Sequence, residues 1–93
     1  MFFPDDTLDF HNTGPIMPYD VEMRFTEFIE DCYIKQHEQI LIITGKGLNS
    51  RQGAKIRPHI QKLLQQNKYI KSFKFASEYN GGRGAFEVQL INN

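Results

Sequence analysis

The chain has 93 residues, 40% of them apolar and 24% charged, and its formal net charge is zero. This length predicts a single domain over residues 1–93 with its core at about 7–91, and the apolar content excludes a disordered chain. One cysteine excludes an internal disulfide, and the longest apolar run, 40–43, is too short to span a membrane. The N-terminus lacks a secretory signal, so we expect a cytoplasmic protein, with a monomer favoured.

The zero net charge conceals a division between the two halves of the chain. Residues 1–38 carry nine acids and two bases, a net charge of −7, and residues 39–93 carry nine bases and two acids, a net charge of +7. Such an asymmetry suggests a basic face that attracts polyanions. The alternative is that the two halves neutralise each other across the surface of a small domain.

An alternating pattern predicts a first strand over residues 7–11. Leu8 and Phe10 fall on one face of this strand, and Asp9 and His11 fall on the other. The pattern is typical of a half-buried strand, so the polar pair should face away from the core.

A helix is expected after a loop at 12–18 that contains glycine and proline, with Asp20 as its N-cap. Its apolar positions recur at helical spacing: Val21, Phe25, Phe28, Ile29 and Cys32. The acids fall largely off that stripe, so the helix should present negative charge to solvent. Cys32 is interpreted as a core residue rather than a reactive thiol, and His37 and His59 as solvent-facing helix residues.

A buried central strand is predicted over 40–43, followed by a glycine-rich basic loop at 44–53 and a second helix. The apolar stripe of the second helix is Ile56, Ile60, Leu63 and Leu64. Pro58 should confine the regular helix, because proline fits a first turn and kinks an interior, and Asn67 should end it.

Two more strands are expected at 70–76 and 85–91, joined by a turn at 77–84. The order β-α-β-α-β-β predicts an α/β fold, a two-layer sandwich of a four-stranded mixed sheet with two helices on one face. Strands one and two, which are connected through a helix, should run parallel. His11 and Thr44 then meet at the carboxyl edge of the sheet, where open α/β sheets bind ligands.

The loop Gly45-Lys46-Gly47 has the composition of an anion-binding loop. Glycines let backbone N–H groups approach an anion, the following helix N-terminus adds partial positive charge, and Lys46 adds a full charge. Glycine required for loop geometry alone is the alternative. A Walker A loop is excluded, because Gly47 stands where serine or threonine should follow the lysine.

Two further motifs have a functional reading beside a structural one. Asp9 and His11 share a strand face, and a carboxylate can orient a histidine and raise its basicity, although such pairs are common without catalysis. Metal binding has less support, because no third ligand stands at useful spacing. The turn over 81–84, Gly-Gly-Arg-Gly, could be a plain hairpin turn, or Arg83 could clamp a second phosphate near the basic loop.

Three motifs in this order resemble the Smr domain, a family related to the C-terminal segment of certain MutS-type proteins. The family opens with Leu-Asp-x-His, which here is Leu8-Asp9-Phe10-His11. Its middle loop, His-Gly-x-Gly or Thr-Gly-x-Gly, is here at 44–47, and its Gly-Gly-x-Gly turn is here at 81–84, before a final strand. The resemblance covers roughly residues 8–91.

The resemblance implies the fold of the C-terminal domain of bacterial translation initiation factor three, and nicking or endonuclease activity on DNA or RNA. His11 would act as a base toward water or a ribose hydroxyl, and Asp9 would orient it or hold a divalent metal such as Mg²⁺. The residues expected to hold phosphate or extend the nucleic-acid track are Thr44, Gly45, Lys46, Gly47, Arg51, Lys55 and Arg83.

The chain departs from the family pattern close to the expected base. The family usually has glycine after the motif histidine, where this chain has Asn12, and the loop to the first helix is longer. Thr44 replaces the commoner histidine, which removes a second acid-base group. These changes bear on catalysis more than on binding. The alternatives are a binding module without chemistry on the same surface and a protein-interaction domain that uses the acidic segment 20–38.

Overall fold

The elements of the chain follow the predicted order. A computed structural model describes residues 1–11, 13–45 and 51–92, with the backbone alone for 51–54. The strands are β1 Asp6–Asp9, β2 Gln39–Ile43, β3 Ile70–Phe75 and β4 Ala85–Leu90, and the helices are α1 Pro18–Ile34 and α2 Arg51–Gln66. Two short 3-10 helices, η1 Glu78–Asn80 and η2 Gly82–Gly84, connect β3 to β4.

The strands form one mixed sheet in the order β1-β2-β4-β3. β1 pairs parallel with β2, as the helical connection between them predicted, and the other two pairings are antiparallel. The apolar strand β2 lies between β1 and β4, and its middle residues Ile40, Leu41 and Ile42 are buried. An interior position explains this run, because side chains on both faces of such a strand are covered.

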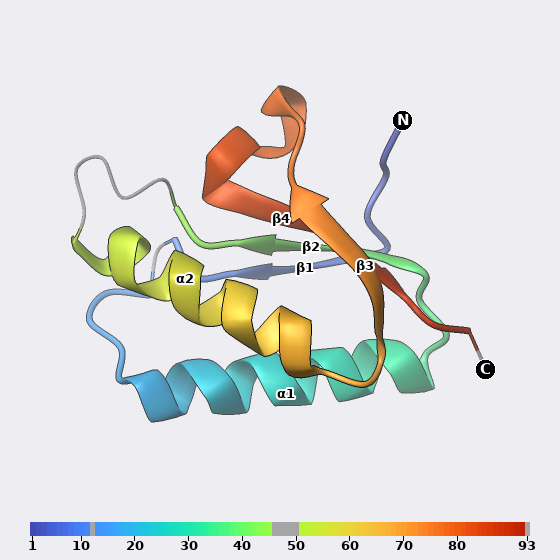
Figure 1. Ribbon diagram of the computed structural model, residues 1–93, viewed down its shortest axis with the longest axis horizontal. Coiled ribbons are helices and arrows are strands. Elements are labelled where there is room, and N and C mark those ends of the chain that lie inside the picture. The colour runs from blue at the N-terminus through green and yellow to red at the C-terminus, as the bar shows by residue number, and fades with distance from the viewer. Residues whose placement is uncertain (12, 46–50, 93) are drawn as a thin grey trace.

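Both helices pack on one face of the sheet, so the predicted two-layer architecture is confirmed (Figure 1). Ile40 and Ile42 of β2 share a single core with the apolar stripes of α1 and α2. The predicted core residues are buried or, for Phe28 and Phe73, half-buried against that core: Leu8, Phe10, Phe25, Phe28, Ile42, Ile60, Leu64, Phe73, Phe86 and Val88. The matched periodicities of strands and helices therefore define the packed side of the sheet.

The opposite sheet face carries a small second cluster and a buried acid. Leu41, Ala76 and Ala85 pack there with Ile43. Glu87 is 5% exposed although it alternates with the inward-facing residues of β4. Its Oε2 accepts hydrogen bonds from the Ser77 N–H (3.1 Å), the Ser77 hydroxyl (2.8 Å) and the Asn80 amide (3.1 Å). These donors, from the β3–β4 connection, allow a charged group to be buried.

Three local expectations were wrong. Helix α1 begins at Pro18, with Met17 as its N-cap, so Asp20 lies inside the first turn rather than capping it. Proline suits this position because its fixed φ is already helical and its missing N–H would have no helical partner. β1 ends at Asp9, so His11 follows the strand. Pro58 does not confine α2, which extends from Arg51 through it to Gln66, because packing of the apolar stripe outweighs one lost backbone bond.

The two remaining histidines differ from their expected places. His37 follows α1 and is half-buried, and its backbone N–H donates to the Cys32 carbonyl. His59 lies on α2, but its Nε2 is 3.0 Å from Glu22 Oε1 on α1. The expected end of the second helix is confirmed, since α2 stops just before Asn67, whose side chain accepts the Tyr69 N–H at 2.8 Å.

Cys32 is expected to be unreactive in the folded protein. Burial, and to a smaller degree the nearby carboxylates of Asp6 and Asp31, raise the pKa of its thiol to about 12. Because the thiolate is the nucleophile, a thiol reagent at pH 8 should modify Cys32 only when the protein is unfolded in urea. Labelling in native buffer at the rate measured in urea would contradict this assignment.

Glu87→Gln should lower stability at neutral pH by about 1–3 kcal/mol, because hydrogen bonds to a charged acceptor are lost. Burial alone would raise the pKa of Glu87, but the bonds from Ser77 and Asn80 outweigh it and hold the pKa below its ordinary value of 4.5. The stabilisation is thus complete above that value and is lost as the pH falls through the lower folded pKa.

Urea unfolding at several pH values between 7 and 3 tests this sign. The difference in unfolding free energy between wild type and Glu87→Gln should shrink as the pH falls. Glu30→Gln, on the exposed face of α1, is the control and should match wild type throughout. A difference that stays constant down to pH 3 would show that the charge of Glu87 is not the cause.

Candidate nucleic-acid interface

The carboxyl ends of β1 and β2 converge, as the parallel pairing requires. Asp9 lies opposite Ile43, and the Phe10 N–H extends the ladder by donating to the Ile43 carbonyl at 2.8 Å. Thr44 directly follows β2, and His11 lies two residues beyond the end of β1, so both lie at this edge. The structure therefore brings together the first two sequence motifs.

Asp9 and His11 are both exposed, but their contact differs from a catalytic pair of side chains. Asp9 Oδ1 accepts the backbone N–H of His11 at 2.7 Å. This hydrogen bond fixes the main chain just beyond β1. Among the described residues, the Asp9 carboxylate is thus bonded to the backbone of His11 and not to its imidazole ring. In this geometry Asp9 positions His11 through its backbone.

Thr44 and Gly45 are held by the glycine-rich turn that precedes β4. Their N–H groups both donate to the Gly84 carbonyl, at 2.8 and 2.9 Å, and the Thr44 hydroxyl lies 3.3 Å from the same oxygen. Thr44 is only 1% exposed, so its side chain supports the loop and does not reach a ligand. Gly45 has φ +86°, a left-handed conformation that favours glycine.

The same contact places Arg83 beside the loop. Arg83 is exposed, precedes Gly84, and holds its guanidinium 5.0 Å from the centre of the Phe75 ring. The turn is built from two successive left-handed glycines, Gly81 at φ +112° and Gly82 at φ +56°. The glycines are therefore required by the geometry of the turn, and the same geometry places Arg83 directly before Gly84, whose carbonyl contacts Thr44 and Gly45.

Two arginines near this edge were missed in the sequence. Arg57 of α2 donates from Nη1 to the Arg83 carbonyl at 3.4 Å, and Arg24 of α1 lies with its guanidinium 5.2 Å from the Phe10 ring centre. The signal for Arg57 was its position two residues beyond Lys55, at the flank of the apolar stripe. For Arg24 no motif gave a signal, since it lies within the acidic half.

Some predicted residues cannot be placed by side chain. Lys46 and Gly47 lie outside the described residues, and Arg51 is known by its backbone as the first residue of α2. Lys55 is exposed on that helix.

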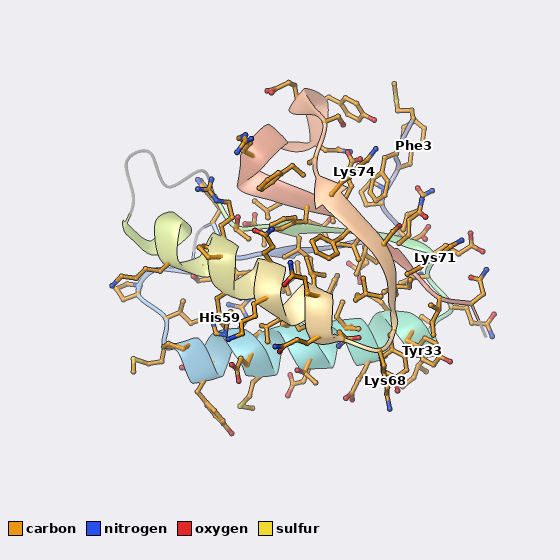
Figure 2. All side chains as sticks on the ribbon, viewed as in Figure 1. Phe3, Tyr33, His59, Lys68, Lys71 and Lys74 are labelled. Carbon is orange, nitrogen blue, oxygen red and sulfur yellow. The ribbon has the colours of Figure 1, made fainter. Side chains whose placement is uncertain are left out.

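The charge division of the sequence becomes a division between the two helices. α1 carries the exposed acids Asp20, Glu22, Glu27, Glu30 and Asp31. α2 has no acidic residue and carries Arg51, Lys55, Arg57 and Lys62. His59 and Glu22 connect the helices, and Figure 2 shows His59 between them. A polyanion at the sheet edge is therefore attracted along α2 and repelled along α1.

The described residues contain no cluster of three or more His, Cys, Asp or Glu side chains. A metal at this edge would therefore have Asp9 as its protein carboxylate, together with water and substrate oxygens, which is a common mode for Mg²⁺. None of the helices, over the residues described, is both long and apolar enough to span a membrane.

Comparison with known proteins identifies the family. The Smr domain matches residues 8–91. The chain belongs to the Smr domain family. It is 31% identical over 71 residues to Endonuclease MutS2 of Geobacillus thermodenitrificans, and 35% identical over 66 residues to Endonuclease MutS2 of Ligilactobacillus salivarius. These matches cover 76% and 71% of this chain but 8% of each relative, so the chain corresponds to a small part of those proteins.

Solved Smr structures share the fold. The Smr domain of Thermus thermophilus MutS2 matches with a TM-score of 0.77 and 20% identity, over 92% of this chain and 98% of that one. YdaL, a stand-alone small MutS-related protein from Escherichia coli, matches with a TM-score of 0.81 and 22% identity, over 92% of this chain and 64% of that one. The likeness in three dimensions thus extends over nearly the whole chain.

The glycine turn beside the site should tolerate substitution less than an ordinary left-handed glycine. A Cβ on Gly81 would lie 3.1 Å from the Ala85 Cβ, whereas one on Gly14, at φ +69°, meets nothing within 4 Å. Gly14→Ala should cost about 1 kcal/mol from backbone strain, and Gly81→Ala roughly 2–3 kcal/mol. Thermal melting of the two variants measures the difference, and equal losses would show that Ala85 yields freely.

Proposed function

We propose that this Smr domain binds nucleic-acid backbones at the carboxyl edge of its sheet and cleaves their phosphodiester bonds. The convergence of the β1 and β2 ends, with Gly84 holding Thr44 and Gly45, is the observation that carries the proposal. It supports a phosphate site at the start of this loop, with Lys46 and Arg51 as charged donors and with Arg83, Lys55 and Arg57 continuing the track. Charged and backbone donors of this kind bind phosphate without reading base sequence.

Cleavage is supported by the relatives named Endonuclease MutS2 and by the place of His11. His11 would take a proton from water or from a ribose hydroxyl. The oxygen of that water or hydroxyl would bond to phosphorus as the bond to the leaving nucleoside oxygen breaks. Lys46 would stabilise the negative charge that develops on the phosphate. Asp9 would keep His11 in place through its backbone N–H, and a Mg²⁺ held there would polarise the phosphate.

Binding without cleavage is the second candidate. The observation in its favour is that the Asp9 carboxylate meets the His11 backbone rather than the imidazole. A histidine whose ring lacks an orienting carboxylate is a weaker catalyst. The binding surface is the same in both candidates, so nuclease assays separate them.

His11→Ala should lower cleavage by roughly 10²-fold or more while binding stays nearly unchanged, because it removes the general base and no phosphate donor. The measurement is cleavage of supercoiled plasmid and of structured RNA with Mg²⁺, Mn²⁺ or EDTA, at matched occupancy. Asp9→Asn should also lower cleavage if Asp9 holds Mg²⁺, because a neutral amide binds this cation less well than a carboxylate does.

His37→Ala is the matched control, because His37 lies before β2, at the opposite edge from His11. It should cleave like wild type. Equal rates for wild type and His11→Ala would remove His11 from the reaction. Binding by wild type with no cleavage of either substrate would select the second candidate.

Arg83→Ala should weaken nucleic-acid binding by about 1 kcal/mol or more and reduce the salt slope of log affinity by about one, because one phosphate contact is lost. Fluorescence anisotropy at several salt concentrations measures both quantities. Lys35→Ala is the control, since Lys35 is paired with Asp31 at 2.9 Å beyond the end of α1. An unchanged slope in Arg83→Ala would show that Arg83 does not contact phosphate.

A further inference from the structure

The sheet face opposite the helices carries a hollow of about 510 Å³. Its floor consists of polar side chains from three strands: Gln39, Ser72, Lys74, Glu87 and Gln89. Phe2 of the N-terminal segment and Tyr79 of η1 stand at its sides. The hollow is thus more polar than an ordinary small-molecule site, and its aromatic rings stand beside hydrogen-bonding side chains.

The N-terminal segment and η1 are tied together at this hollow. The Phe2 N–H donates to the Tyr79 hydroxyl at 3.1 Å, and the Asn80 amide donates to the Phe2 carbonyl at 3.2 Å. Tyr79 remains 58% exposed, so its ring is available to a ligand. Figure 2 shows Lys74 and Phe3 in the same upper part of the molecule.

The polar floor offers both donors and acceptors. Oε2 of Glu87 receives the three hydrogen bonds from Ser77 and Asn80, so that carboxylate is fixed in position. The Ser72 hydroxyl donates to Gln89 Oε1 at 3.4 Å, which directs the Gln89 amide donors to other partners. Lys74, opposite Glu87 in the β3–β4 register, adds a positive charge.

We propose that this hollow binds one unpaired nucleotide of the nucleic acid that is held at the carboxyl edge, which rests on the proposed function. A base stacks on the exposed ring of Tyr79, its edge meets the side-chain amides of Gln39 and Gln89, and its phosphate meets Lys74. Aromatic stacking and base-edge hydrogen bonds of this kind are how single-stranded bases are recognised.

One short connection links the hollow to the proposed phosphate site. The β3–β4 connection carries Ser77 and Tyr79 at the hollow and Arg83 at the sheet edge. The Gly82 N–H donates to the Ser77 carbonyl at 3.0 Å, which closes the connection on itself. The Arg83 guanidinium lies over Phe75, which packs on the helix side of the sheet, so a strand held at Arg83 reaches Tyr79 by passing around the β3–β4 connection to the other face. A base in a continuous duplex is stacked and paired, so the hollow selects substrates with an unpaired nucleotide.

The test compares a labelled single-stranded oligonucleotide with a labelled, fully paired duplex by fluorescence anisotropy. Tyr79→Ala should weaken single-strand binding roughly 5- to 150-fold, which is the range for loss of one stacked base, and leave duplex binding unchanged. Tyr79→Phe keeps the ring and loses the bond to Phe2, so it should bind like wild type. Tyr19→Ala, at an exposed tyrosine of α1, is the matched control.

Two further measurements separate stacking from a structural effect. A 2-aminopurine placed in the single strand should be quenched by wild type and by Tyr79→Phe but not by Tyr79→Ala. Lys74→Ala should weaken single-strand binding more than Lys71→Ala, because both lysines are exposed on β3 and Lys74 lines the hollow. Melting curves verify that each variant is folded.

The outcomes distinguish this inference from the proposed function. If Arg83→Ala lowers the affinity for both oligonucleotides but Tyr79→Ala binds the single strand like wild type, nucleotide binding in the hollow is ruled out and the proposed phosphate site stands. If Tyr79→Ala lowers the affinity for the single strand and for the duplex equally, nucleotide binding in the hollow is also ruled out. If Arg83→Ala weakens neither probe, the phosphate site is contradicted, and the hollow stands only if Tyr79→Ala still weakens the single strand.

Discussion

The parallel pairing of β1 with β2 is the constraint from which the arrangement of the site follows. Because both strands run in the same direction, their carboxyl ends reach one edge, and the residues that follow them must lie together. The buried run of β2 lies in the interior of the sheet, and β1 forms the edge strand beside it. The β4 side completes the edge, since the Gly84 carbonyl accepts the N–H groups of Thr44 and Gly45. A single backbone oxygen thus joins two glycine-containing motifs.

The electrostatic potential differs between the two helices that lie beside this edge. With acids on α1 and bases on α2, the helical layer has one repulsive and one attractive side for a polyanion. The zero net charge of the chain says nothing about this division, because it averages over both helices. The idea that the two halves neutralise each other therefore applies to the total charge of the chain.

The motif residues Asp9, His11 and Thr44 lie where the family pattern predicts, but their contacts differ from those of a catalytic pair. Asp9 and His11 occupy the expected edge, but the carboxylate is used to fix the main chain. Thr44, where histidine is commoner in the family, is buried beneath the turn. On the other sheet face, Glu87 and Tyr79 form a surface that none of the three motifs includes.

The sequence by itself determined the element order, the buried stripes and the meeting of the first two motifs, because these depend on local periodicity and on the parallel connection of β1 to β2. It also carried the family, through three motifs in order. The start of α1 and the path of α2 through Pro58 were mispredicted, since proline at a first turn and the packing of a whole helix outweighed single-residue preferences. Only the tertiary structure decided that Arg57 meets Arg83, that Thr44 meets Gly84 and that Glu87 is buried. Those contacts join distant parts of the chain, so no local pattern could encode which side chains would face one another.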